Sequence, residues 1–216
     1  MKAICTALVL AAASSALAQV SDVADSDKYG WGENIGWLNF RDAGTPAGRD
    51  GLVVLHNHLA GYVWGENVGW ISLGNSSSSL DPQYTNADGP SHGVNLNVAT
   101  GALTGYAWGE NIGWINFGGG AMATPAQPAR IDFAARRLRG YAWGENVGWI
   151  NLDDGAHFVG LRCPSDFDGN SFVNADDYDF FMDAFVAGDI AADYDRNTFV
   201  NGEDYDAFVA AFEAGC

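Results

Sequence analysis

Four near-identical copies of one thirteen-residue phrase contain all eight tryptophans of this 216-residue chain. Each copy has the pattern W-G-E-N-x-G-W at its centre, and the copies span residues 28–40, 61–73, 105–117 and 140–152. Self-similarity at a spacing of tens of residues is typical of repeat architectures, in which each unit buries its apolar face against a neighbour. The phrase is constant while the connections differ in length, so we expect a fixed scaffold with variable loops.

Alternating residues within each copy predict a β-hairpin. In the third copy, Tyr106 and Trp108 share one face of a strand, and Ile112 and Trp114 share one face of the next. We expect residues 109–111 to form the loop, with its Asn suited to a left-handed conformation. This register places Trp108 opposite Ile112 and Tyr106 opposite Trp114. Because tryptophans repeated with Gly, Ile and Val usually pack in the interior, we expect them to form the core of each unit.

Further strands are expected outside the hairpins. Residues 51–55, 94–98 and 130–133 precede the last three hairpins, the first hairpin has no such partner, and an orphan strand-like run at 156–161 follows the fourth. A last strand that completes the first unit would close a ring and remove exposed sheet edges. We therefore predict an all-β array of four three-stranded repeats, closed as a propeller or a barrel. An open meander or solenoid is the alternative.

Composition divides the chain near residue 162. We predict a β-repeat domain at 19–162 and a second domain at 163–216, which is short enough to need a disulfide or bound metal for stability. The formal net charge is −17, and residues 163–216 hold 13 acidic side chains against one Arg. An acidic surface is repelled by the phosphates of nucleic acid, which excludes that class of partner. Clustered carboxylates need counter-ions, and calcium is the natural one in a secreted protein.

The beginning of the chain predicts export. Residues 1–18 read as a secretory signal peptide, with one Lys, an apolar run and a final A-L-A sequence before the expected cleavage. We expect a secreted protein without a membrane span, from which Cys5 leaves with the signal. Cys163 and Cys216 then bracket the acidic segment and predict one disulfide in an oxidising compartment. Two unpaired thiols are the alternative.

The second domain contains two aligned twelve-residue loops, 166–177 and 193–204. Oxygen-bearing side chains recur at loop positions 1, 3, 5, 9 and 12, and a backbone carbonyl is expected at position 7, which is a spacing that wraps oxygens around calcium. Apolar residues at helical intervals follow each loop, at 178–186 and 205–212. We predict two calcium ions, held by Asp166, Asp168, Asn170, Phe172 (backbone carbonyl), Asn174 and Asp177, and by Asp193, Asp195, Asn197, Phe199 (backbone carbonyl), Asn201 and Asp204.

These paired D-x-D-x-N-x-F-V-N-x-x-D loops, each continuing into D-Y-D and a helix, resemble a type I dockerin. The C-P sequence at residue 163 and the terminal A-G-C resemble its cysteine-flanked "GC-type" variant. The resemblance covers residues 163–216. It implies a compact, α-helical, EF-hand-like module that binds two calcium ions and docks onto a partner, typically a cohesin, to tether its host in an extracellular or cell-surface assembly.

The resemblance is incomplete at two kinds of position. The family's partner-reading positions correspond here to Ala175, Asp176, Gly202 and Glu203. They lack the hydroxyl pair of the best-known dockerins, so the partner's identity does not carry over. Position 6 of each loop, which is usually Gly, is Ser171 or Thr198. The alternative to docking is that the ions only fold the module.

The hairpin tips carry one acidic side chain per copy: Glu33, Glu66, Glu110 and Glu145. These are the candidate glycan-binding residues, because carboxylates accept hydrogen bonds from sugar hydroxyls while Trp and Tyr faces stack on sugar rings. Glycoside hydrolysis needs two carboxyls in different environments, and four equivalent Glu give no such asymmetry, so we predict no catalytic residues. His56 and His58 lie two residues apart, a spacing that could suit a metal, but His92 and His157 have no matching spacing. All four histidines are therefore interpreted as ordinary surface residues.

Three functions of different classes follow from these features. The leading hypothesis is a non-catalytic display or interaction repeat, tethered by calcium-dependent docking to a cohesin-like or other surface protein. The second is a carbohydrate-binding component of a polysaccharide-degrading system. The third and weakest is a glycoside hydrolase that acts on polysaccharide.

Overall fold

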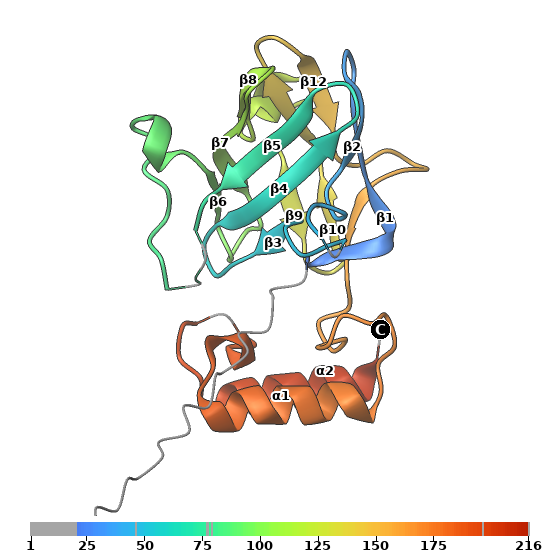
Figure 1. Cartoon of the computed structure of the whole chain (residues 1–216), viewed down its shortest axis with the longest axis vertical. Helices are drawn as coiled ribbons and strands as arrows, with labels where there is room; N and C mark the ends of the chain where they lie inside the picture. Colours follow the sequence, from blue (N-terminus) through green and yellow to red (C-terminus); the bar gives the residue numbers. More distant parts are fainter. Residues whose placement is uncertain (1–20, 46, 77, 79, 196, 216) are drawn as a thin grey trace, which may run out of the picture.

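The computed structural model describes residues 21–45, 47–76, 78, 80–195 and 197–215. It is mostly β-structure, followed by two C-terminal helices that pack side by side (Figure 1). The predicted signal peptide at 1–18, which includes Cys5, lies outside the described residues.

Eight strands form a closed antiparallel barrel, to which each copy of the phrase contributes one hairpin. These strands are β1 (Val23–Gly32), β2 (Gly36–Asn39), β4 (Leu59–Gly65), β5 (Gly69–Gly74), β7 (Leu103–Gly109), β8 (Gly113–Asn116), β11 (Tyr141–Gly144) and β12 (Gly148–Asn151). Closure occurs where β12 pairs with β1, through Trp31 with Asn151 and Gly32 with Ile150. The predicted closure is confirmed, and its form is a barrel rather than a propeller or an open array.

The remaining strands lie outside the barrel sheet. They are β3 (Val53–Val54), β6 (Val94–Leu96), β9 (Arg130–Asp132), β10 (Arg137–Arg139) and β13 (Val159–Leu161). Strand β3 pairs with β4 and β6 pairs with β7, as expected for leading strands. Strand β13 pairs with β1, so the orphan run does complete the first copy. The fourth copy differs from the predicted three-stranded unit, because β9 pairs with β10 rather than with the hairpin strand β11.

The tryptophans lie on the outside of the barrel, so the prediction that they form the core is wrong. Trp108 pairs with Trp114 and Tyr106 with Asn116, which also corrects the predicted register. Trp114 is 40 % exposed. The alternate side chains of the strands point inward and fill the interior. They are aliphatic: Leu38, Val63, Ile71, Ala107, Ile115, Ala142 and Ile150. Eight strands enclose a space only just wide enough for side chains to fill, so small aliphatic groups fit inside and indoles do not.

Each hairpin turns through three residues. In the third copy the N–H of Ile112 donates to the carbonyl of Gly109 at 3.1 Å, and residues 110–112 form the loop. The left-handed conformation falls on Gly113, with φ +79°, and not on the Asn of the loop. A tight turn followed by a left-handed Gly is a common three-residue hairpin connection.

A ring of asparagines joins the four hairpin tips. Each side-chain amide donates to a backbone carbonyl at the tip of the preceding copy: Asn34 to Val147 (3.1 Å), Asn67 to Ile35 (3.0 Å), Asn111 to Val68 (3.0 Å) and Asn146 to Ile112 (3.1 Å). The accepting residues are themselves buried, at 2–6 % exposure, and close that end of the barrel interior. The ring therefore explains why every copy carries Asn after Glu.

The C-terminal segment is internally duplicated. Helices α1 (Ala175–Ala187) and α2 (Gly202–Ala214) follow the two acidic loops. They begin three residues earlier than predicted, because Asn174 and Asn201 cap them with capping boxes. Phe181 stacks on Phe208, its equivalent 27 residues later, with ring centroids 3.9 Å apart and planes at 5°. The apolar cluster around this pair shares no residue with the barrel core.

Arg162 links the barrel to the first acidic loop. Its backbone N–H donates to the carbonyl of Asp22 at 2.9 Å. Its guanidinium donates to the Asp22 carboxylate at 3.4 Å and to the backbone carbonyl of Asp166 at 3.1 Å. One side chain thus contacts both the start of the barrel and the first residue of the loop.

Candidate metal centres and the aromatic surface

Each acidic loop brings three carboxylates together. Oxygens of Asp166, Asp168 and Asp177 lie within 4.8 Å of one another, and so do those of their equivalents Asp193, Asp195 and Asp204. The first and last carboxylates of each trio are buried, with Asp177 and Asp204 fully so. The six predicted carboxylate ligands are therefore gathered as two equivalent clusters.

The first aspartate of each loop is buried within a cluster of negatively charged carboxylates. Oδ1 of Asp166 is buried and has no hydrogen-bond partner among the described residues, while Oδ2 accepts the N–H of Ser171 at 3.0 Å. Burial raises the pKa of the Asp166 carboxyl, and the neighbouring carboxylates of Asp177 and Asp168 raise this pKa further. The N–H of Ser171 and the charge of Arg162 oppose the increase. Burial likewise raises the pKa of Asp193. A bound cation would coordinate the unpaired Oδ1 of Asp166 and neutralise the negative charge of the clustered carboxylates.

The predicted amide ligands make other contacts within their loops. The amide nitrogen of Asn170 donates to Oδ2 of Asp168 at 2.6 Å, and its oxygen accepts the N–H of Phe172 at 2.8 Å. Asn174 caps α1 by accepting the N–H of Asp176 at 2.6 Å. Asn197 and Asn201 repeat this pattern in the second loop. The side chains of Phe172 and Phe199, whose carbonyls are the predicted ligands, are 73 % and 71 % exposed.

The loops wrap tightly although position 6 is not Gly. Ser171 and Thr198 take φ of 72° and 76°, in the left-handed region that Gly usually supplies. These conformations direct the N–H groups of Ser171 and Thr198 to the first aspartate of each loop, Asp166 and Asp193. An all-oxygen donor set of this kind suits a hard divalent cation. The residues present therefore fit the predicted ion.

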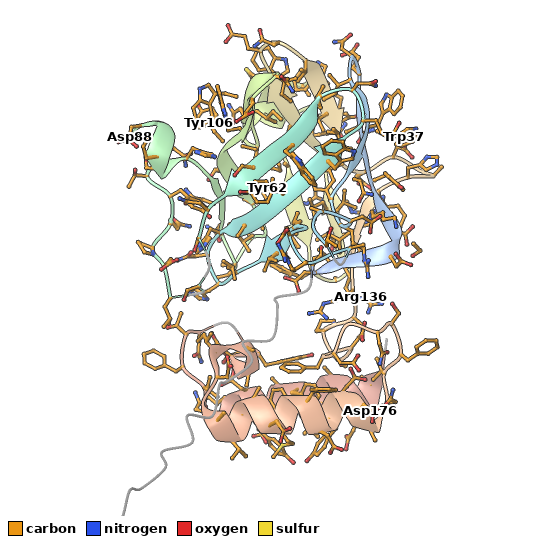
Figure 2. All side chains as sticks on the ribbon, in the orientation of Figure 1. Trp37, Tyr62, Asp88, Tyr106, Arg136 and Asp176 are labelled. Carbon is orange, nitrogen blue, oxygen red and sulfur yellow. The ribbon has the colours of Figure 1, made fainter. Side chains whose placement is uncertain are left out.

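The predicted partner-reading residues are exposed and lie in the first turns of the helices: Ala175, Asp176, Gly202 and Glu203. Asp176 lies in the first turn of α1 (Figure 2). Cys163 is disulfide-bonded, and its predicted partner Cys216 lies outside the described residues.

The aromatic side chains of the repeats form a belt on the outer face of the barrel. Trp31 and Trp37 meet edge to face at 4.7 Å, and the corresponding pairs of the second and third copies lie 4.6 Å and 4.5 Å apart. Trp37, Tyr62 and Tyr106 lie on this outer surface (Figure 2). The alternation of side chains along each strand places the Trp and Tyr residues on one face. The width of the barrel, which the sequence does not reveal, decides that this face is the outer one.

The four tip glutamates are exposed, and their carboxylates make no hydrogen bond or ion pair within the described part of the chain: Glu33, Glu66, Glu110 and Glu145. Two of them line open hollows of the surface. Glu33 lies in a hollow of 490 Å³ and Glu145 in one of 530 Å³, both walled by Trp and Tyr. The structure thus brings single carboxylates beside aromatic rings.

One of the four histidines is not a surface residue, which corrects that interpretation. His58 is fully buried, and its Nε2 has no hydrogen-bond partner among the described residues. Its ring packs edge to face on Tyr84, with centroids 5.0 Å apart. Burial lowers the pKa of His58.

Comparison of the chain with protein-family models, curated proteins and solved structures gives no match. Within the described ranges, the search for a helix both long and apolar enough to cross a bilayer finds none.

Proposed function

We propose that this chain is an exported, non-catalytic protein whose C-terminal module folds around two calcium ions and docks the barrel onto a protein of an extracellular or cell-surface assembly. The observation that carries the proposal is the pair of equivalent loops with buried, crowded carboxylates and an orphaned oxygen on Asp166. The disulfide at Cys163 supports an oxidising compartment.

Calcium, when bound, supplies the positive charge that these buried carboxylates lack. Asp166, Asp168 and Asp177 would hold the first ion, and Asp193, Asp195 and Asp204 the second. The last aspartate of each loop also accepts the N–H of the helix-capping Asn, at 2.8 Å in both loops. Ion binding and helix formation therefore use the same side chain, so binding free energy is available for folding.

Isothermal titration of the calcium-free protein tests the metal assignment. We expect two calcium ions per chain for the parent and one for either Asp166→Asn or Asp193→Asn. Asp179→Asn is the matched control, because Asp179 is exposed on α1 outside both clusters. Two ions bound to both cluster variants, with unchanged affinity, would refute the assignment.

The exposed first turns of α1 and α2 are the proposed contact with a cohesin-like partner. Arginines at Ala175 and Gly202 add bulk there without a clash, since a side chain at Gly202 meets open space. We expect the Ala175→Arg/Gly202→Arg variant to lose calcium-dependent capture by a panel of immobilised cohesin modules. Ala187→Arg/Ala214→Arg adds the same charge at exposed positions on the opposite ends of the same helices and should be captured like the parent. Capture that persists in EGTA would argue against docking through a calcium-folded module.

A second function is supported by the exposure of the tryptophans. Eight indoles and their companion tyrosines on the outside of a barrel are a large apolar surface for a single chain, and such surfaces commonly mark binding sites. We infer that the barrel binds a neutral polysaccharide, because residues 19–162 hold 14 acidic side chains against eight basic ones, which disfavours an anionic polymer. Retardation of the protein in gels that contain β-glucan, xyloglucan or galactomannan tests this function. Release of reducing sugar from these polymers would instead favour the hydrolase.

A further inference from the structure

The two hollows that hold tip glutamates are built from equivalent residues. We call the boundary between the hairpins of neighbouring copies a seam. The hollow at the seam of copies 3 and 4 is lined by Tyr106, Trp114 and Asn116 of one copy and by Trp143 and Glu145 of the next. The hollow at the seam of copies 4 and 1 is lined by the same five positions: Tyr141, Trp149, Asn151, Trp31 and Glu33.

Neither hollow belongs to a single hairpin. In each, one copy supplies Tyr, its second Trp and Asn, and the following copy supplies its first Trp and Glu. The barrel sheet fixes this arrangement, because β8 pairs with β11 through Asn116 and Trp143, and β12 pairs with β1 through Asn151 and Trp31. The Asn of one copy therefore sits directly across from the first Trp of the next.

The chemistry of the five positions matches a sugar ring. Two indoles and a phenol offer flat apolar surface for the C–H face of a pyranose, and the Glu carboxylate accepts hydrogen bonds from hydroxyls. Oδ1 of Asn116 accepts the N–H of Gly118 at 2.8 Å, and that of Asn151 accepts the N–H of Asp153 at 3.0 Å. The amide nitrogens of these two Asn donate no hydrogen bond within the described residues and so remain as donors. Volumes of 490 and 530 Å³ fall in the range of about 300–1,000 Å³ typical of ligand pockets.

The walls of the hollows come from segments that are not repeated. Met122, at the end of the short helix η2 (Gly119–Met122), lines both hollows and stands between them. Residues around η1 (Gly89–Ser91) line the hollow at copies 3 and 4, and among them Asp88 projects from the barrel (Figure 2). At the seam of copies 1 and 2, the ring of His157 packs on Trp37 at 4.7 Å instead. The four seams therefore share one strand pairing but differ in the residues around it, and the seam of copies 2 and 3 has Ser72 across from the first Trp where the other three have Asn.

We propose that the seams on either side of the fourth copy are the sugar-binding sites of this barrel, each binding one segment of a neutral polysaccharide. This inference rests on the polysaccharide-binding function proposed above and assigns its residues. The hollows are open rather than enclosing, which suits a polymer that passes across the surface and not a small cation that an aromatic cage would surround. Two sites on one barrel bind one polymer chain more tightly than either site alone.

Affinity electrophoresis of the full chain in β-glucan, xyloglucan and galactomannan gels tests the assignment. The seam variant Trp114→Ala/Trp149→Ala removes the second Trp from both hollows. Its matched control is Trp37→Ala/Trp70→Ala, which removes the second Trp from the other two copies, and these two residues line neither hollow. Each variant removes two indoles that pack on the Tyr of their own copy, and one further His contact, that of Trp114 with His92 or that of Trp37 with His157. The thermal midpoints of the two variants should therefore be similar.

We expect the seam variant to bind the retarding polymer about tenfold more weakly than the parent, and the control to bind within about twofold. The carboxylate pair Glu33→Gln/Glu145→Gln should also weaken binding, and Glu66→Gln/Glu110→Gln should not. Equal loss in seam and control variants, with the parent still retarded, would overturn the seam assignment alone. No retardation of the parent by any of the polymers would refute the polysaccharide function itself. Saturable quenching of tryptophan fluorescence by choline that the seam variant abolishes would assign the hollows to an organic cation and overturn the proposal.

Discussion

The tip asparagines are the residues by which each hairpin holds its neighbour. Changing Asn111→Ala removes the 3.0 Å hydrogen bond to the carbonyl of Val68, so we expect the free energy of unfolding to fall by about 1 kcal/mol. Urea denaturation measures the change. Glu110→Gln is the control, because this neighbouring side chain is exposed and makes no such bond within the described residues. Equal losses in the two variants would contradict a structural role for the amide.

The buried His58 predicts a pH dependence of stability. Burial lowers its pKa in the folded protein, so the unfolded chain takes up a proton first as the pH falls below the ordinary value of about 6.5. The contribution of neutral His58 to the free energy of unfolding is therefore fully present above that pH. It is lost as the pH falls, by at most about 1.4 kcal/mol per pH unit. Nearby Asp81 opposes the shift and His56 adds to it.

Urea denaturation at pH 7.5, 6.5 and 5.5 measures this slope. We expect His58→Gln to be flatter than the parent over this interval, and His157→Gln, which changes an exposed ring, to keep the parent slope. A His58→Gln variant as steep as the parent would show that other groups cause the loss.

The structural role of a single residue can be predicted from the sequence in some cases and not in others. The aspartates of the two loops could be predicted because a metal loop is local, and its spacing alone brings the side chains together. The burial of His58 could not be predicted, because it depends on Tyr84, which lies 26 positions further along the chain in an irregular connection.

The hairpins depend on two glycines that have different tasks. Gly113 supplies the left-handed residue after the turn, and a side chain there would meet only an amide nitrogen at 3.2 Å. Gly105, also left-handed with φ +86°, lies where β7 pairs with β6, and a side chain there would clash with the backbone carbonyl of Gly93.

We therefore expect Gly113→Ala to cost about 1 kcal/mol of stability for the left-handed backbone. Gly105→Ala should cost about 1–3 kcal/mol more, because backbone must move. Urea denaturation of both variants gives the comparison, with Gly155→Ala as the control, since a side chain at Gly155 meets open space. A smaller loss for Gly105→Ala than for Gly113→Ala would contradict this ranking.

The hairpins themselves could be predicted from sequence, but not which face is buried. Alternation separates Tyr106, Trp108 and Trp114 from Ala107 and Ile115, and both sets are apolar. The larger set looked like the core because burial favours large apolar groups. The choice is reversed by a property of the whole barrel, its narrow interior, which no single hairpin contains. The loop was misplaced by one residue for a related reason, since Glu and Asn suit turns equally well in either register.

Calcium removal should separate the two parts of the molecule. All eight tryptophans lie in the repeats, and the helical cluster shares no residue with the barrel core. After addition of EGTA we expect the helical signal at far-ultraviolet wavelengths to fall, while the near-ultraviolet signal of the tryptophans persists. Circular dichroism measures both in one sample. Collapse of the tryptophan signal on chelation would show that the barrel depends on the ions.

Closure of the barrel could be predicted because a missing strand at one end of the array was matched by a surplus strand at the other. The seam hollows could not. The hollows combine side chains of neighbouring copies with residues of non-repeated segments such as η2. The positions of these segments depend on connections that have no repeat pattern.

The displaced strand also sets an order of events for the growing chain. β1 is made first, yet its partners β12 and β13 come from residues 148–161, so its outer edge stays unpaired until nearly the whole barrel has been made. Pairing of such distant segments is slow, because a long loop must close before any contact is gained. The last three residues of the barrel region, Val159–Leu161, thus act as a latch. A chain interrupted before them could still close the barrel through β12, but the first part of β1, from Val23 to Lys28, would lack its partner β13. Such an unpaired edge is the part of a β-protein most prone to join another chain.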